Sequence, residues 1–154
     1  MKNYKYLFLF LFCLPIISSP KFSEARLAFH GGYTFETLKG QRAAAAYVSI
    51  FNPSDKDIYI KSISTDICES AEIHEIVLKE DIMKMQKVSS LKISAMGEVY
   101  LQPGNTHIML MGLKKELVKG SSFKIIFESQ NQGKFGVKIL VLDSKLRENL
   151  LDRK

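Results

Sequence analysis

The segment THIMLMG, residues 106–112, carries side chains that suit the binding of a soft metal ion. His107 and Met109 are two residues apart, so on a β-strand their side chains point to the same face. A ring nitrogen and a thioether sulfur would then lie next to each other. The same pattern also suits an ordinary core strand, because methionine often fills gaps in protein cores. The segment by itself therefore leaves a metal site and a buried strand open.

A second histidine and methionine lie in the segment AEIHEIVLKEDIMKM, which is typical of a β-hairpin. The predicted register places His74 directly opposite Met85, at a Cβ separation of about 5 Å. The same register pairs Glu75 with Lys84, whose opposite charges would meet on the other face of the hairpin. This hairpin is therefore predicted to supply a second pair of ligands.

Two imidazole nitrogens and two thioether sulfurs form a soft ligand set without charge. Thioethers favour Cu(I), whereas Zn(II) is more often held by thiolate or carboxylate groups. Neutral ligands leave the single charge of Cu(I) in place, and such a site can pass its ion to a protein that offers thiolates. The side chains therefore favour Cu(I), although a histidine on a strand is also common as a hydrogen-bonded structural residue.

The elements that position these side chains are predicted to be β-strands, because apolar residues recur with a period of two along most of the chain. In FGVKILV, for example, Phe135, Val137 and Ile139 share one face. Turn formers such as NPSD and PGN separate the segments. Seven further segments have this character: AAYVSIF, DIYIKSIS, AEIHEIVL, IMKMQKV, GEVYLQ, THIMLMGL and SFKIIFE. Short strands at this spacing predict an antiparallel β-sandwich or barrel, with residues 26–42 as a possible edge strand with loops.

The two ends of the chain differ from this β-rich middle. Residues 1–25 combine a short basic region, an apolar run and small residues near Ala25, which predicts a secretory signal peptide cleaved after Ala25. A lipoprotein signal at Cys13 and an uncleaved anchor are the alternatives. Residues 143–154 are charged, with leucines at helical spacing, and predict a short helix or tail. Residues 26–142 would form a single domain.

Charge and cysteine content narrow the possible partners and the sources of stability. Cleavage after Ala25 removes three lysines and one glutamate and lowers the formal net charge from +6 to about +4. Because this excess is spread along the chain without a dense stripe of lysine and arginine, a nucleic-acid partner is not expected. Cleavage also removes Cys13, so the exported protein would keep only Cys68 and form no internal disulfide. Its domain must then be stabilised by burial of apolar surface.

The spacing of the four candidate ligands forms a specific pattern. His74, Met85, His107 and Met109 are separated by ten, twenty-one and one residues, which resembles the periplasmic copper chaperones of the PCu(A)C family. The resemblance extends to the segments AAAAYVSIFNPSD, EIHEIVLKEDIMKM and LQPGNTHIMLMGLKKELVKGSSFKIIF, and it covers roughly residues 43–127. Four ligands at three fixed gaps inside matching strands are a more specific signal than a short motif.

The resemblance implies a cupredoxin-like, antiparallel Greek-key β-sandwich that binds Cu(I) through His74, Met85, His107 and Met109 at one end. It also implies a periplasmic metallochaperone that delivers copper to the binuclear copper centre of cytochrome c oxidase. The partner would be subunit II of that oxidase or another copper chaperone. A monomer is expected. No enzyme activity is expected, since no catalytic triad, phosphate-binding loop or carboxylate pair is evident in the sequence.

The chain departs from the family in two places. Asp81 occupies the hairpin turn where many members have glycine. Residues 112–154 contain neither histidine nor methionine, so a second Cu(II) site in the tail is not predicted. Three further methionines are expected to have lesser roles: Met111 and Met96 in packing, and Met83 in shielding the ligands.

Three other functions are compatible with the sequence. General copper buffering or tolerance would use the same site. An electron-transfer cupredoxin needs two histidines and a cysteine with a weak axial methionine, whereas Cys68 lies upstream of every proposed ligand. A metal-free scaffold would tolerate the loss of His107 and Met109. Cys68 is expected to be a buried or incidental thiol, and His30 to be structural or exposed.

Overall fold

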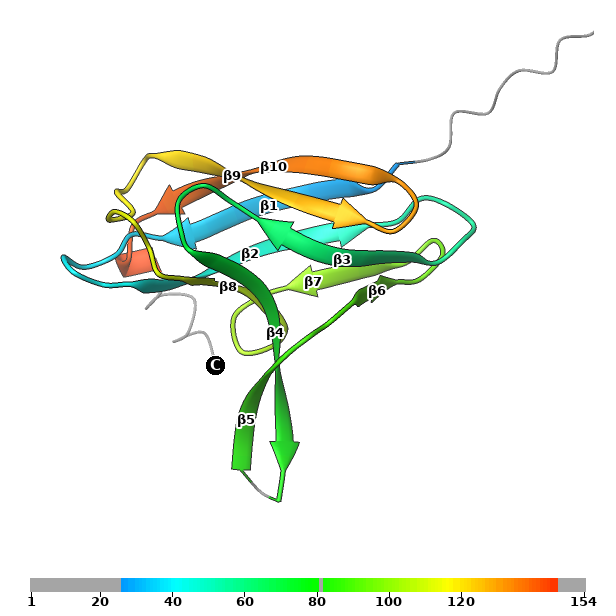
Figure 1. Ribbon diagram of the computed structural model, residues 1–154, viewed down its shortest axis with the longest axis horizontal. Coiled ribbons are helices and arrows are strands. Elements are labelled where there is room, and N and C mark those ends of the chain that lie inside the picture. Colours follow the sequence, from blue (N-terminus) through cyan, green and yellow to red (C-terminus); the bar gives the residue numbers. More distant parts are fainter. Residues whose placement is uncertain (1–25, 81, 147–154) are drawn as a thin grey trace, which may run out of the picture.

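The computed structural model describes residues 26–80 and 82–146, and these residues form ten β-strands (Figure 1). Eight of them coincide, to within two residues at either end, with the eight segments predicted from the period-two pattern, so the all-β prediction is confirmed. The short strand β6 was not predicted. In chain order the strands are β1 (Ala28–Phe35), β2 (Ala43–Phe51), β3 (Ile58–Ser64), β4 (Ser70–Lys79), β5 (Ile82–Lys87), β6 (Leu91–Ile93), β7 (Glu98–Leu101), β8 (His107–Met111), β9 (Ser122–Ser129) and β10 (Gly133–Leu142).

The alternation of apolar and polar residues determines which face each strand buries. In β10 the side chains of Phe135, Val137 and Ile139 are buried, and the residues between them are exposed. β8 buries Ile108 and Leu110 completely in the same way. Because neighbouring side chains on a strand point to opposite faces, the other residues of β8 point away from this core.

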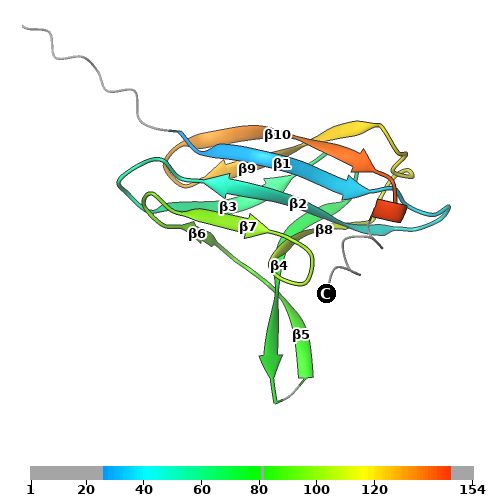
Figure 2. The same cartoon turned by 180° about the vertical axis from the view of Figure 1, so that it is seen from behind.

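Hydrogen bonds connect the strands in the order β5-β4-β8-β2-β1-β10-β9-β3-β6, with β7 attached to β2. Apolar side chains from β2, β3, β8 and β9 belong to one core cluster, so the sheet curls around a single core. Figures 1 and 2 show this body from opposite sides, with β9 and β10 along one margin and the β4–β5 hairpin projecting away from the other. β5 lies at one end of the strand order, and all six of its residues are exposed.

β1 is not the edge strand that the sequence suggested. It pairs antiparallel with β2 and parallel with β10, so it lies inside the sheet and adds a parallel contact to a mostly antiparallel fold. One extra residue between His30 and Tyr33 forms a bulge in its pairing with β2. Gly31 has φ 63° at this bulge, a backbone conformation that glycine adopts without a steric penalty.

The turn after β2 is held in place by the side chain of Asn52, which is fully buried. Its Nδ2 donates hydrogen bonds to the carbonyl oxygens of Lys56, Ile93 and Ser94. Its Oδ1 accepts a hydrogen bond of 3.0 Å from the backbone N–H of Ser54. A buried amide is tolerated where its donors and acceptor are paired, so Asn52 ties the β2–β3 turn to the end of β6.

Two of the predicted segments lie wholly or mostly outside the described residues. They are the signal peptide over residues 1–25, Cys13 included, and the tail over residues 143–154. Within the described part of the tail, Oδ1 of Asp143 accepts a hydrogen bond of 2.9 Å from the backbone N–H of Lys145, as at the start of a helical turn. No helix in residues 26–80 and 82–146 is long and apolar enough to cross a membrane.

Candidate metal centre

Two histidines face each other across the pairing of β4 with β8. His74 is the direct register partner of His107, and their ring centroids are 6.3 Å apart at an interplanar angle of 61°. In the same register Glu72 is the partner of Met109. Since register partners lie on one face of a sheet, the two rings, the thioether and the carboxylate are gathered together. The structure thus places three of the four predicted ligands side by side.

This face of β8 is the one that does not enter the main core. Ile108 and Leu110 occupy the core face and are completely buried, so His107 and Met109 point to the opposite side. The register partner of Met109 on the neighbouring strand β2 is Ala45. A methyl group takes little space, which leaves room above β8 for the thioether. The same-face prediction for His107 and Met109 is confirmed.

The predicted register of the β4–β5 hairpin is wrong by two residues. His74 pairs with Lys87 rather than with Met85, and Met85 pairs with Ile76. Because a shift of two residues keeps every side chain on its face, His74 and Met85 still share one face. They are diagonal neighbours, whose Cβ atoms lie about 7 Å apart in an ideal antiparallel pair. Met85 is therefore near His74 but not directly opposite it.

The turn of the hairpin lies one residue further along the chain than the predicted register requires. That register pairs Leu78 with residue 81, whereas in the structure Lys79 pairs with Ile82, and Glu80 adopts φ 52° in the turn. Two-residue turns with left-handed backbone match the twist of the flanking strands and are therefore favoured in hairpins. The predicted contact of Glu75 with a lysine is replaced by a hydrogen bond of 2.6 Å that Nε2 of Gln86 donates to Oε1 of Glu75.

The backbone next to β8 determines which nitrogen of His107 is free. Nδ1 of His107 lies 2.8 Å from the carbonyl oxygen of Asn105. A carbonyl oxygen can only accept, so in this contact Nδ1 carries the proton and the lone pair lies on Nε2. Metal-binding histidines commonly donate their second nitrogen to a carbonyl or carboxylate in this way. In this arrangement Nε2 is the nitrogen of His107 that is available to a ligand.

Glu72 is a polar residue of this face that the sequence analysis missed. Its Oε2 lies 2.9 Å from Nε2 of His74, and its Oε1 accepts a hydrogen bond of 2.7 Å from Nζ of Lys87. The hydrogen bonds from His74 and Lys87, the former being the larger cause, hold the pKa of the Glu72 carboxyl below its usual value. Its position two residues before His74 on the same strand was a signal that could have revealed it.

The four predicted ligands differ strongly in exposure. His107 is 6% exposed and the side chain of His74 is 15% exposed, whereas Met85 is 55% exposed. Met109 is partly buried. The candidate centre is therefore closed on the side of β8 and open on the side of β5, where another protein can approach it.

Other methionines and the third histidine lie apart from this group or at its margin. Met111 is partly buried two residues beyond Met109, and Met83 is 70% exposed near the tip of the hairpin. The expectation that Met96 packs into the protein is wrong, because it is exposed in a turn with φ 52°. His30 was expected to be structural or exposed, and it lies exposed on β1.

Cys68 is a buried free thiol within the core cluster, as expected. Its Sγ donates a hydrogen bond of 3.2 Å to the carbonyl oxygen of Ser70. Burial raises the pKa of this thiol, which disfavours the thiolate that a metal ion requires. Among the described residues no three histidine, cysteine, aspartate or glutamate side chains are grouped so that they could hold a metal ion.

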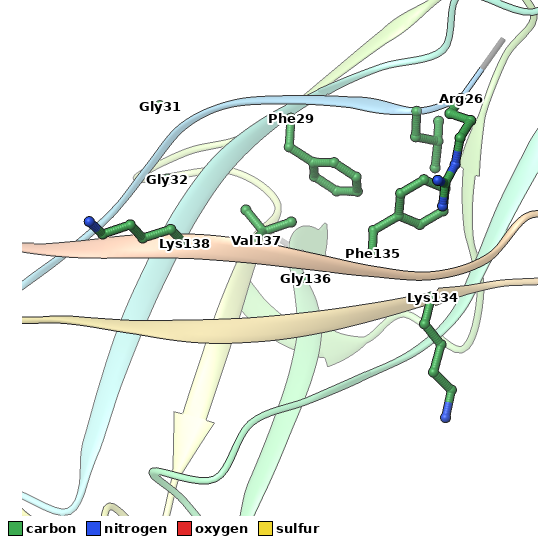
Figure 3. Close-up of a pocket in the computed structure, with 10 residues that line it drawn as sticks. Arg26, Phe29, Gly31, Gly32, Lys134, Phe135, Gly136, Val137 and Lys138 are labelled. Carbon is green, nitrogen blue, oxygen red and sulfur yellow. The ribbon is translucent and has the colours of Figure 1, made fainter.

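A hollow of about 600 Å³ lies between β1 and β10 (Figure 3), and none of the residues that line it belongs to β4 or β8. Among its lining residues, Phe29 and Phe135 pack against each other with ring centroids 5.5 Å apart, and Cζ of Arg26 lies 5.1 Å from the centre of the Phe135 ring. The hollow is lined by neither histidine nor methionine. It therefore offers no alternative place for a soft metal ion.

Comparison with known proteins relates this geometry to a family. Residues 27–141 match the family described as "Putative lipoprotein LpqE-like". An uncharacterized protein of Rickettsia prowazekii, RP573, is 34% identical over 85 residues, which cover 54% of this chain and 47% of that protein. The chain spans about half the length of the curated relatives that it matches.

Solved structures share the fold. The copper-bound PCuAC domain from PmoF2 aligns with a TM-score of 0.65 at 14% identity, covering 76% of this chain and 92% of that domain. The solution structure of Cu(I)-DR1885 from Deinococcus radiodurans aligns with a TM-score of 0.57 at 29% identity, covering 73% and 75%. These alignments confirm the predicted cupredoxin-like β-sandwich. The chain therefore belongs to the LpqE-like family and has the fold of the PCuAC domains.

Proposed function

We propose that this protein binds one Cu(I) ion through His74, Met85, His107 and Met109 and transfers it to a partner protein. The register of β4 with β8 carries this proposal, because it sets two imidazole rings next to each other with Met109 on the same face. Two neutral nitrogens and two thioethers are a ligand set that Cu(I) favours. Structures of the same fold from PmoF2 and Deinococcus radiodurans support the proposal, since they hold copper and Cu(I) respectively.

Transfer would proceed by exchange of ligands rather than by release of a free ion. Met85 lies on the exposed strand β5, whereas His107 is enclosed by the body of the protein. A thiolate of the partner would therefore bind the ion as the thioether of Met85 leaves, and the two histidines would be the last ligands to dissociate from the ion. Thiolate is a softer, charged ligand, which gives the transfer its direction. No chemical turnover is part of this function.

The acceptor would be the binuclear copper centre in subunit II of cytochrome c oxidase, or another copper chaperone in the same compartment. General copper buffering is the alternative, and it would use the same ligands. The two are separated by mixing the Cu(I)-loaded protein with the soluble domain of subunit II. Transfer at near-equimolar concentrations supports delivery, whereas retention of the ion against this acceptor supports buffering.

This function requires export from the cytoplasm. Cleavage after Ala25 would release the protein into the periplasm, whereas processing at Cys13 would anchor it to a membrane through a lipid. The family description names lipoproteins, which keeps the second route open. The mass of the mature protein distinguishes the two, because only processing at Cys13 leaves an acylated cysteine at the amino terminus.

The binding step is tested by anaerobic competition for Cu(I) with a chromogenic chelator. We expect the purified protein to hold one equivalent and the double variant His107→Ala/Met109→Ala to lose it. The double variant His30→Ala/Met96→Ala removes the same residue types from exposed positions outside the group, so it is a matched control that should bind normally. Equal binding by both variants would refute the proposed ligands.

A further inference from the structure

We propose that Glu72 fixes the tautomer of His74, so that His74 binds Cu(I) through Nδ1 while His107 binds it through Nε2. This inference rests on the proposed function, because it assigns the nitrogen that each histidine offers to the ion. It makes Glu72 a positioning residue: its carboxylate acts through His74 and does not contact the metal.

The contact between Glu72 and His74 determines where the ring proton lies. Oε2 of Glu72 is 2.9 Å from Nε2 of His74. An ionised carboxylate can only accept hydrogen bonds, so Nε2 must be the donor. A neutral imidazole has one proton, and its lone pair is therefore left on Nδ1. Carboxylate partners of this kind orient metal-binding histidines and increase the basicity of the nitrogen that binds the ion.

A second, independent observation concerns Nδ1 itself. It is the one fully buried side-chain nitrogen or oxygen within residues 26–80 and 82–146 that lacks a hydrogen-bond partner. A buried acceptor without a partner is costly, and native proteins keep few of them. A metal ion bound at Nδ1 would satisfy this lone pair. The ring therefore has one nitrogen tied to a carboxylate and the other free for a ligand.

Lys87 keeps the carboxylate in position. It is the register partner of His74 on β5, and its Nζ donates a hydrogen bond of 2.7 Å to Oε1 of Glu72. Each oxygen of Glu72 is thus held by a different residue, which fixes the plane of the carboxylate. The positive charge of Lys87 also offsets the negative charge of the Glu72 carboxylate. The ligand set near the ion then stays close to neutral, as a site that later releases Cu(I) requires.

His107 shows the opposite arrangement. Its Nδ1 donates to the backbone of Asn105, which leaves Nε2 for the ion. The two histidines therefore have opposite tautomers although they are direct register partners. Opposite tautomers on rings whose centroids are 6.3 Å apart present the ion with two different nitrogens.

Long-range proton–nitrogen correlation spectra of the nitrogen-15-labelled protein test the tautomers directly. In the metal-free protein at neutral pH we expect His74 to carry its proton on Nε2 and His107 to carry it on Nδ1. Addition of one equivalent of Cu(I) should then shift Nδ1 of His74 and Nε2 of His107. A proton on Nδ1 of metal-free His74, or a Cu(I)-induced shift at Nε2 of His74 instead, would overturn the inference. If neither ring responds to Cu(I), the proposed function fails while the tautomers of the metal-free protein can still be read.

A pair of isosteric variants gives a second test. Glu72→Gln should weaken Cu(I) binding about 10- to 100-fold, the usual cost of losing a partner behind a metal ligand, and should let His74 populate both tautomers. Glu75→Gln is the matched control, because Glu75 lies on the other face of β4. This variant should bind Cu(I) normally. Thermal melting of both variants checks that they fold. Equal affinity of the two variants would overturn the inference. So would tighter binding by Glu72→Gln, because the carboxylate would then compete with the ion.

Discussion

The two strands that carry the proposed methionine ligands differ in almost every physical respect. β8 lies between β2 and β4, and on the face opposite to Met109 it buries Ile108 and Leu110 completely. β5 has a partner on one side only, and all six of its residues are exposed. Met109 is therefore anchored by the core, whereas Met85 lies on the projecting hairpin of β4 and β5, which we call the arm.

In the proposed function, this difference divides the work of the site between the body of the sheet and the arm formed by β4 and β5. The body holds His107 and Met109 at fixed positions, which a metal ion needs for tight binding. The arm presents Met85 where another protein can reach it. A site built entirely in the body would bind the ion but hide it, and a site built entirely on the arm would be too loosely held.

The largest expected difference between the two regions is in stability. Leu110→Ala should lower the free energy of unfolding by about 2–5 kcal/mol, because it leaves a cavity in a fully packed core. Met83→Ala on the arm should change it by no more than about 0.5 kcal/mol, since the side chain is mostly exposed. Urea unfolding measures both. Similar losses for the two variants would show that the arm is packed as firmly as the body.

The next effect is on binding by the body. His107→Ala should reduce the affinity for Cu(I) by more than the roughly 100-fold that marks the upper range for losing a partner behind a ligand. The reason is that a direct ligand with its tautomer already set is removed. Anaerobic chelator competition gives the value. His30→Ala removes an exposed histidine from β1 and is the control, so a comparable loss there would contradict the assignment.

Removal of the ligand on the arm should have a smaller effect on binding. We expect Met85→Leu to weaken Cu(I) binding by about tenfold, or about 1.4 kcal/mol, because three ligands remain and the side chain is half in solvent. Met109→Leu, measured in the same competition, should cost more. The transfer rate to a thiolate acceptor should rise in Met85→Leu, since the leaving ligand is already absent. A slower transfer would mean that Met85 guides the acceptor instead of yielding to it.

The smallest effect is a pH dependence that belongs to the body alone. Hydrogen bonds from Lys92 and from the backbone N–H of Ala95 lower the pKa of Asp57 below its ordinary value of 3.8. A carboxyl whose pKa is lowered by folding stabilises the folded protein when the pH is above the ordinary pKa of the carboxyl. This contribution is lost as the pH falls through the pKa of the folded state. Asp57→Asn should thus destabilise the protein slightly at pH 7, and the difference should shrink below pH 3.8.

Unfolding curves recorded over a series of pH values measure this contribution. Copper affinity at pH 7 should be the same in Asp57→Asn and in the unchanged protein, because Asp57 contacts β6 and the turn after it and not the histidines. A difference in stability that grows on acidification would show that the sign assigned to Asp57 is wrong.

The faces of the strands were predictable from the sequence, because a spacing of two fixes the side on which a residue lies. That rule alone placed His107 and Met109 on a common face. For His74 and Met85 it also needed the predicted hairpin pairing, whose error of two residues leaves both side chains on the same face. The register of the hairpin was not predictable in the same way. It depends on the left-handed backbone at Glu80, and the charges of Glu75 and its neighbours gave a plausible but wrong alternative.

Long-range pairings left even less trace in the sequence. β1 lies inside the sheet because Tyr33 pairs with Leu140, more than a hundred residues away, and no local pattern reports such a contact. The role of Glu72 was hidden for a different reason. A glutamate on a strand usually faces water. The spacing of two between Glu72 and His74 places both on one face, but the contact of Glu72 with Lys87 depends on the register of the hairpin, which was predicted wrongly.

The free edge of β5 has a consequence for self-association. An unpaired strand edge presents backbone N–H and C=O groups that can template a strand from another copy, and proteins often oppose this with lysine. Lys84 lies exposed on β5, on the face opposite to Met85, so a second hairpin that approaches this edge meets a positive charge there. Like-charge repulsion thus opposes self-association of the arm that the proposed function opens to a copper acceptor, and added salt would weaken this repulsion.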